Sequence, residues 1–292
     1  MEVSSESVGA RCKTLEVVVT PRQAMNYAAG VGDANPWYLD DERPEGIVAP
    51  PMLSVALTWD ISARFQEYWA ALRFPLEALA QQVHYSEYIE WKRPIKPGDQ
   101  LRIEGEVKAI LPHPRGTHLV MAYDAVDPHG EIVFTEHIGG LLRGVSCSDQ
   151  GRGAQHVPQP VTCSMPETPL WEKTLHIDPL ASYVYDACAN INFPIHSSPA
   201  FAHSVGLPGI LYQGTATLAL AVREIVDTEA GADPRRLRSV SCNFTGMVSP
   251  GSPIRVRALR RDLDKGLVRV YFAVLNAGGK EAIRNGYATL FG

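Results

Sequence analysis

The strongest constraint on the fold is an internal repeat with a period of about 150 residues, far longer than a solenoid repeat. In the first half, MNYAAGVGDANPWYLDD precedes GIVAPPMLSVALTWDI; in the second, SYVYDACANINFPIHSS precedes GLPGILYQGTATLALAVREIV. Further along, Pro97-Gly98 matches Pro250-Gly251, and DPHGEIVFTEHIGGLL matches NAGGKEAIRNGYATL. Three matching blocks in the same order indicate a duplicated domain.

Each copy has the same predicted order of elements: a loop, one long helix, and then several strands. The helix of the second copy is predicted from apolar residues at helical spacing, and so is that of the first. The strands are predicted from LRIEGEV, HLVMAYDAV and LVRVYFAVL, which are rich in strand-forming residues. A helix with so many apolar residues must be covered by other elements. A curved antiparallel sheet wrapped around it would cover it, so we predict an α+β fold. The apolar helix positions are Leu218, Ala221, Val222, Ile225 and Val226 in the second copy, and Leu53, Leu57, Ile61 and Phe65 in the first.

The stretch PIHSSPAFAHSVGLPGILYQGTATLALA resembles the MaoC-like family of (R)-specific 2-enoyl-CoA hydratases. The usual motif of that family is Asp-x-Asn-Pro-Ile/Leu-His, followed by His-Gly-Met or a similar sequence at the start of the central helix. The resemblance implies a double hot dog, in which two tandem sheets each wrap around one helix. We expect a degenerate hot dog over residues 1–144, a linker over 145–164, and a motif-bearing hot dog over 165–292.

The two copies divide the family motif between them. The first copy keeps Asp33 but has Tyr38 at the histidine position. The second copy keeps His196 but has Ile191 at the aspartate position. The resemblance implies that this acid and histidine act together on a water molecule and on the α-carbon of the substrate. The second copy is therefore the predicted site, and it lacks one of the two groups.

Hydration of an enoyl thioester needs a base for water, an acid for the α-carbon, and donors for the thioester oxygen. Histidine suits the first task because its pKa lies near neutrality. Backbone amides at a helix N-terminus suit the third. The predicted catalytic residues are His196, Asn192 and Asn190, and the predicted substrate-binding residues are Gly214, Gln213 and Ile191.

The origin of the acid is open at this point. A one-residue shift of the loop would bring Asn190 or Asn192 into the aspartate position, although an amide is a poor acid. Asp186 precedes the loop, and Asp33 belongs to the other copy. His196 acting alone with water is a further alternative.

Charge and composition limit the partners. The net charge of −5 argues against non-specific nucleic-acid binding, and the absence of an apolar run of about 18 residues argues against a membrane span. The basic run of Arg235, Arg236 and Arg238 is either a solvated surface or a landing site for CoA phosphates. The histidines and five cysteines show no metal-ligand spacing, so we expect reduced thiols in a cytoplasmic protein without a cofactor beyond the CoA of its substrate. We expect a monomer or homodimer.

Three activities fit these features. The first is hydration or dehydration of a 2-enoyl or 3-hydroxyacyl thioester, with steroid- and polyketide-related substrates as a variant. The second is thioester hydrolysis, because hot dog enzymes also include thioesterases. The third is a non-catalytic subunit that binds acyl thioesters, which the loss of the aspartate at Ile191 favours.

Overall fold

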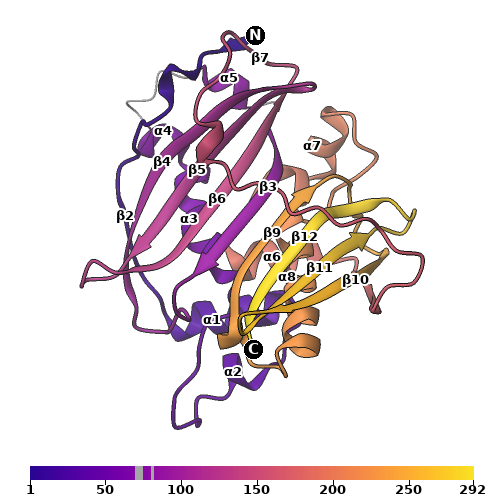
Figure 1. The fold of residues 1–292 in the computed structure, drawn as a ribbon. Coiled ribbons are helices and arrows are strands. Elements are labelled where there is room, and N and C mark those ends of the chain that lie inside the picture. Colours follow the sequence, from indigo (N-terminus) through magenta and orange to yellow (C-terminus); the bar gives the residue numbers. More distant parts are fainter. Residues whose placement is uncertain (70–74, 80–81) are drawn as a thin grey trace.

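The structure is a computed structural model that describes residues 1–69, 75–79 and 82–292. In this described part, ten strands form one sheet in the order β2-β4-β5-β6-β3-β9-β12-β11-β10-β8. The sheet curves around the long helices, which lie behind it in Figure 1. Two tandem hot dogs are therefore joined edge to edge, as the resemblance implied.

The N-terminal copy supplies one half of the sheet and the helices behind it. Its strands are β2 (Leu15–Val18), β3 (Gln82–Trp91), β4 (Gln100–His113), β5 (Gly116–Val126) and β6 (Ile132–Arg143). Its helices are η1 (Ser5–Ser7), α1 (Pro21–Gly30), α2 (Pro36–Leu39), α3 (Leu53–Ala63), α4 (Phe65–Tyr68) and α5 (Leu76–Leu79). A separate two-stranded sheet pairs β1 (Glu2–Val3) with β7 (Ser146–Cys147).

The C-terminal copy supplies the other half. Its strands are β8 (Trp171–His176), β9 (Leu237–Phe244), β10 (Pro253–Asp264), β11 (Leu267–Leu275) and β12 (Glu281–Phe291). Its helices are α6 (Ala181–Ala189), η3 (Pro194–His196), α7 (Pro199–Ser204), α8 (Gly214–Glu229) and η4 (Pro234–Arg236). The predicted strand runs lie in β4, β5 and β11, so these strand predictions are confirmed.

The central helices differ in length. The predicted apolar positions of α8 are all buried along its 16 residues. The first copy was expected to continue its helix through Phe65, but α3 ends at Ala63. The chain leaves helical geometry at Arg64 (φ −109°, ψ 43°), whose guanidinium bonds Asp60 and Glu67 on the surface. Phe65 then opens the separate helix α4.

The two copies meet at the antiparallel pair β3–β9. Tyr88 lies opposite Ser241, and these two residues occupy equivalent positions in the two copies. On either side of this pair, each residue of β3 lies opposite a residue of β9 in the same symmetric way. This register is that of a pseudo-two-fold axis through the Tyr88–Ser241 pair. Equivalent residues of β3 and β9 can therefore be counted back from Pro97-Gly98 and Pro250-Gly251.

Matching backbone hydrogen bonds fix the equivalence around the central helices. The amide of Ala49 bonds the carbonyl of Ile95 at 2.8 Å, and that of Tyr212 bonds the carbonyl of Val248 at 2.8 Å. Counted two residues on from each of these amides, Pro51 of the first copy occupies the place of Gly214 in the second, although α3 begins two residues later, at Leu53. A proline there removes one of the amides that an anion site at the helix start would use.

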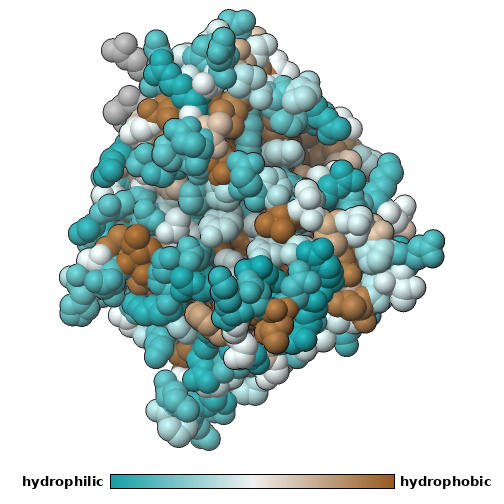
Figure 2. Space-filling view, viewed as in Figure 1, coloured by the Kyte–Doolittle hydropathy of each residue, from teal (hydrophilic) through white to brown (hydrophobic). Residues whose placement is uncertain are grey.

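The segment between the copies crosses the outer face of the sheet (Figure 1). Its beginning, which we expected to be linker from residue 145, is tied to the first copy through β7 and a bridge between Arg152 and Ile110. Irregular chain then continues to Trp171 rather than ending at residue 164. The viewed face is mostly hydrophilic, with hydrophobic side chains in small separate patches (Figure 2).

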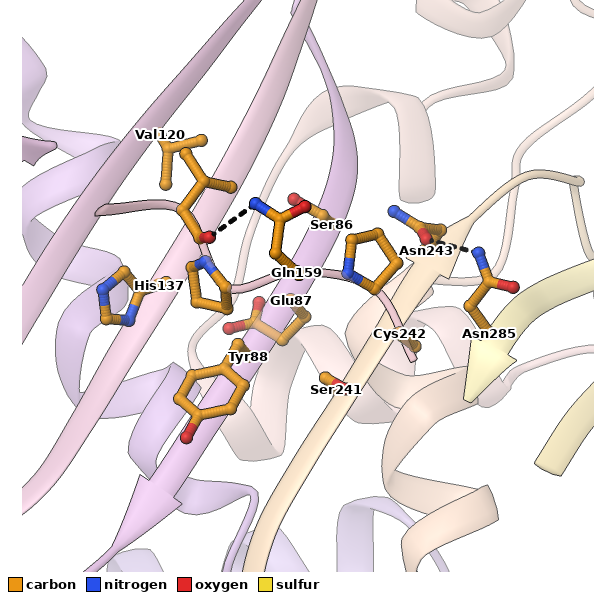
Figure 3. A pocket seen from close by; sticks show the side chains of 13 residues that line it. Ser86, Glu87, Tyr88, Val120, His137, Gln159, Ser241, Cys242, Asn243 and Asn285 are labelled. Atoms are coloured by element: carbon orange, nitrogen blue, oxygen red, sulfur yellow. Dashed lines mark hydrogen bonds between the residues drawn. The ribbon is translucent and has the colours of Figure 1, made fainter. Parts of the chain in front are cut away.

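A small pocket lies where residues 157–160 pass over β3 and β9 (Figure 3). Its lining includes Tyr88, His137 and Gln159, and Asn285 donates a hydrogen bond to Asn243 beside it at 3.0 Å. His196 is not part of this lining, so the pocket is separate from the predicted site.

Candidate active site

The His196 ring has a defined orientation. It follows the proline that starts η3, and its Nδ1 lies 2.9 Å from the carbonyl oxygen of Leu211. A carbonyl only accepts, so Nδ1 carries the proton and donates, which leaves Nε2 of the neutral ring with a free lone pair. Burial lowers the pKa of His196 from its ordinary value, and this favours the neutral ring. The ring therefore has the protonation state that a base requires.

The start of α8 lies three residues beyond Leu211. Its N-cap is Gln213, whose side chain makes no capping hydrogen bond. The Gln213 amide nitrogen Nε2 instead donates to the carbonyl of Ser182 at 3.0 Å, and its buried Oε1 has no hydrogen-bond partner among the described residues. The first-turn amides thus have no side-chain cap, and the helix dipole favours an anion at this end.

Gly214 is packed against an aromatic ring. A Cβ atom at this position would lie 3.2 Å from Cδ1 and 3.3 Å from Cε1 of Phe244. The ring of His84 also packs against Phe244, with the two ring centroids 4.4 Å apart. The helix start therefore contacts β9 and, through Phe244, the beginning of β3 from the other copy.

A line of buried hydroxyl groups also contacts the first turn of α8. Tyr185 Oη donates to Thr215 Oγ1 at 3.1 Å, and the hydroxyls of Tyr27 and Tyr185 are 3.0 Å apart. These residues come from α8, α6 and α1, so both copies contribute to the position of the helix start. The sequence patterns gave no indication of this contact, because tyrosines in amphipathic helices are ordinary core residues.

Two family models match the two copies. The "MaoC like domain" matches residues 164–276, and the "FAS1-like, dehydratase domain region" matches residues 6–136. The chain belongs to the MaoC-like family.

Relatives and solved structures agree with this membership. The chain is 27% identical over 214 residues to a "Peroxisomal multifunctional enzyme type 2" of Drosophila melanogaster, and 25% identical over 179 residues to "Enoyl-CoA hydratase 2, peroxisomal" of Arabidopsis thaliana. These matches cover 71% and 59% of this chain. A crystal structure of a MaoC-like dehydratase from Phytophthora capsici superposes with a TM-score of 0.86 at 22% identity, over 99% of this chain and 98% of that one.

The match spans only part of each curated relative. It covers 34% of the Drosophila protein and 58% of the Arabidopsis protein. In the "Fatty acid synthase subunit beta" of Aspergillus oryzae, which is 34% identical over 112 residues, it covers 38% of this chain and 5% of that protein.

In this MaoC-like chain, the position of the motif aspartate is apolar. Ile191 is buried, with 3% of its surface exposed. Asn190 ends α6 in the left-handed conformation (φ 55°), which is a turn-forming role. Asn190 and Asn192 are both exposed, and within the described chain no hydrogen bond joins either side chain to His196. Their catalytic role stays a prediction that these contacts do not support.

The two aspartates considered as replacements lie in different places. Asp33 accepts a hydrogen bond from the amide of Asn35 at 3.0 Å, as expected for a residue that stabilises its own loop. Its neighbours Arg223 and Asp227 lie further along α8, about 14 and 20 Å from Gly214 along the helix axis. The alternative that Asp33 serves His196 stays a prediction that these contacts do not support. Asp186 is half-buried in α6, and its pKa is raised by burial.

The basic run after α8 is also at the far end of that helix. Arg235 pairs with Asp233 at 2.7 Å and stacks on the Trp37 ring, while Arg236 donates to the carbonyls of Ala230 and Phe291. Arg238 pairs with Glu90 at 2.8 Å. The predicted contact with CoA phosphates stays a prediction, and the fold does not bring these guanidinium groups to the His196 end.

The MaoC-like fold also buries a polar cluster to which the sequence analysis assigned no role. Glu87 Oε2 lies 2.9 Å from Nε2 of His84, and Thr58 donates to Glu136 Oε2 at 2.6 Å. Glu87 and Glu136 expose 2% and 0% of their surface, and each carboxyl group influences the pKa of the other. Burial raises the pKa of both carboxyl groups and lowers the pKa of His84. The sequence did contain one sign of this cluster. Glu87 is two residues before Ile89 in β3, so strand alternation predicts that this carboxyl group points into the core.

Proposed function

We propose that the protein catalyses hydration or dehydration of a 2-enoyl or 3-hydroxyacyl thioester, and that CoA carries the acyl group. The observation that carries this proposal is the hydrogen bond from His196 Nδ1 to Leu211, three residues before the uncapped start of α8. It holds the neutral imidazole against the loop that leads into this helix start. Membership in the MaoC-like family and the similarity to an enoyl-CoA hydratase 2 support the same reaction.

In this proposal, His196 is the base in the hydration direction. Its free Nε2 takes a proton from water as the water oxygen bonds the β-carbon. The thioester oxygen gains negative charge and is held by the amides at Gly214 and the next residue. Glycine at 214 lets the Phe244 ring pack directly against the backbone of the helix start, because a Cβ there would lie 3.2 Å from the ring.

The N-terminal copy has lost each of these groups. The histidine position is Tyr38, which is buried at 2% exposure, and the glycine position is Pro51, which has no amide hydrogen. One active site per chain follows from these differences. The N-terminal copy then has a supporting role, such as covering the acyl chain.

Two other activities remain candidates in the same site. A thioesterase would use the same amides for the tetrahedral intermediate, but Ile191 leaves only His196 to activate water. A non-catalytic binding subunit would account for the absent aspartate. The fixed tautomer of His196 favours the hydratase, because a binding role does not require a free ring nitrogen.

The first test follows crotonyl-CoA and longer enoyl-CoAs by loss of the conjugated thioester absorbance and by release of free thiol. We expect loss of absorbance without thiol. His196→Ala should lower kcat by about 10²-fold or more, since a positioned base contributes about 10²–10⁴-fold.

The matched control is His203→Ala, a change at an exposed histidine of the neighbouring helix α7 that should leave the rate within about twofold of wild type. Thiol release would favour the thioesterase. Thermal stabilisation by CoA esters without turnover would favour the binding subunit.

A further inference from the structure

Among the described residues, no side-chain acid of the C-terminal copy hydrogen-bonds the ring of His196. Ile191 cannot carry a proton, and the side chains of Asn190 and Asn192 are exposed without a contact to His196 in the described chain. Syn addition of water still requires a proton for the α-carbon. A group that supplies it must lie near the start of α8, where the thioester would be held.

The other copy presents an acid at this place. The His84 ring packs against Phe244, and the ring of Phe244 packs against the backbone of Gly214. Nε2 of His84 is buried against Glu87, whereas 24% of the His84 side chain is exposed. The ring therefore reaches from the buried carboxyl group toward the surface next to the helix start.

The pseudo-symmetry of the molecule supports this placement. Counting back from the matched Pro-Gly turns makes Trp91 equivalent to Phe244, Leu237 to His84, and Val240 to Glu87. Pro51, Trp91 and Leu237 line one pocket in the N-terminal copy. The two-fold relation thus predicts that Gly214, Phe244 and His84 line the equivalent place in the C-terminal copy.

The two equivalent places differ in polarity: ionisable side chains in one are replaced by apolar side chains in the other. Where the C-terminal site has His84 and Glu87, the degenerate site has Leu237 and Val240. Buried carboxyl groups without full hydrogen bonding destabilise a fold. Glu87 has both carboxyl oxygens, and Glu136 one, without a geometrically good hydrogen bond in the described chain. Such groups are retained where they serve a function.

We propose that His84 and Glu87 of the N-terminal copy are the second proton-transfer pair of the active site in the C-terminal copy. This inference rests on the proposed hydratase function. Its distinctive claim is that the acid lost at Ile191 is replaced from the other hot dog, across the β3–β9 seam.

The proton balance of the reaction is as follows. Water bonds the β-carbon and gives its proton to Nε2 of His196, while the π electrons of the double bond move to the thioester enolate. The α-carbon takes a proton from Nδ1 of His84, and Nε2 of His84 takes one from Glu87. Solvent then returns a proton to Nδ1 of His84, which gives its Nε2 proton back to Glu87, and solvent removes the proton from His196, so the net change is the addition of one water.

The protonation states suit this direction of transfer. Burial raises the pKa of Glu87, and the hydrogen bond between Thr58 and Glu136 holds the second carboxyl group beside it. Burial lowers the pKa of His84, so a neutral imidazole and a carboxylic acid are the favoured forms. Glu136 and Thr58 are positioning residues, because they act through Glu87.

The test compares His84→Gln and Glu87→Gln with wild type on crotonyl-CoA across pH. We expect kcat to fall by about 10²-fold or more in each variant, with KM changed by less than about threefold. The acid must be protonated to act, so wild-type kcat should fall at high pH, and this limb should be absent from both variants. A purely structural role would lower the melting temperature without removing the limb.

The matched control is His137→Gln. This residue lies in the same half of the sheet, on the outer face, where its ring packs edge-on against Tyr88. Its activity should stay within about twofold of wild type. Because Glu87 is buried, each variant is checked by thermal melting, and His84→Gln decides the question if Glu87→Gln does not fold.

The outcomes separate this inference from the proposed function. An active wild type with full activity in His84→Gln overturns the inference and leaves the hydratase in place. A wild type that turns over no enoyl thioester overturns both. Loss of the high-pH limb in the variants, with substrate still bound, supports the replacement of the acid from the other copy.

Discussion

At the scale of single residues, the candidate site depends on one proton position. The hydrogen bond from Nδ1 of His196 to Leu211 leaves Nε2 free, and the neighbouring hydroxyl of Ser182 donates to the same carbonyl at 3.2 Å. Two donors on one carbonyl hold the ring and the loop before α8 together. The loop before α8 therefore determines which ring nitrogen of His196 carries the proton.

The pH dependence of kcat/KM belongs to this scale. His196 acts only when unprotonated, and burial lowers its pKa from the ordinary value of 6.5. Activity should therefore persist as pH falls through 6.5 and should be lost only at lower pH, where the buried ring becomes protonated. The measurement is kcat/KM for crotonyl-CoA between pH 4.5 and 8 in steps of about half a unit. A midpoint above 6.5 would contradict this assignment.

At the scale of secondary-structure elements, the beginning of α8 is the decisive feature. Its first turn has no side-chain cap, contacts Phe244 on one side, and is held by Tyr185 through Thr215 on the other. The equivalent helix α3 begins after two consecutive prolines and stops after 11 residues. The two copies therefore have the same fold but only one helix start that is suited to an anion.

Gly214→Ala tests the helix start. The added methyl would meet the Phe244 ring at about the distance where the ring must shift, so we expect kcat/KM to fall by about tenfold or more. The melting temperature should change little, because alanine favours a helix. Gly209→Ala is the control, since a Cβ there has nothing within 4 Å. Equal activity in both variants would show that no close approach occurs at Gly214.

At the scale of the whole molecule, the N-terminal copy is joined to the C-terminal copy at both ends of α8. At the far end, Arg223 donates to the carbonyls of Val31 and Gly32, and Asn35 donates to the carbonyl of Ala232. Trp37 lies between the guanidinium groups of Arg43 and Arg235, each 3.7 Å from its ring. The former motif loop has become a contact between the copies.

The dependence of one copy on the other can be tested by expressing residues 165–292 alone. This fragment would expose β9 along an edge that is paired with β3 in the full chain, together with the apolar surface of α8. We expect self-association or aggregation and no hydratase activity. Size-exclusion chromatography, circular dichroism and the crotonyl-CoA assay measure these properties. A folded, active monomer would contradict the view that both copies form the site.

The described part of the chain contains no helix long and apolar enough to cross a membrane. The cytoplasmic location, the cofactor-free reaction and the monomeric or homodimeric state stay predictions. Sedimentation of the full chain would decide the oligomeric state.

The sequence by itself determined the duplication, the α+β architecture and the division of the motif, because helix periodicity, strand alternation and Pro-Gly turns are local properties. It also determined that His196 and Gly214 belong to the better-preserved copy. Only the tertiary structure decided that Asp33 lies at the wrong end of α8 and that His84 and Glu87 lie near its start. These relations depend on which strands pair across the seam, and no short stretch of sequence contains that information.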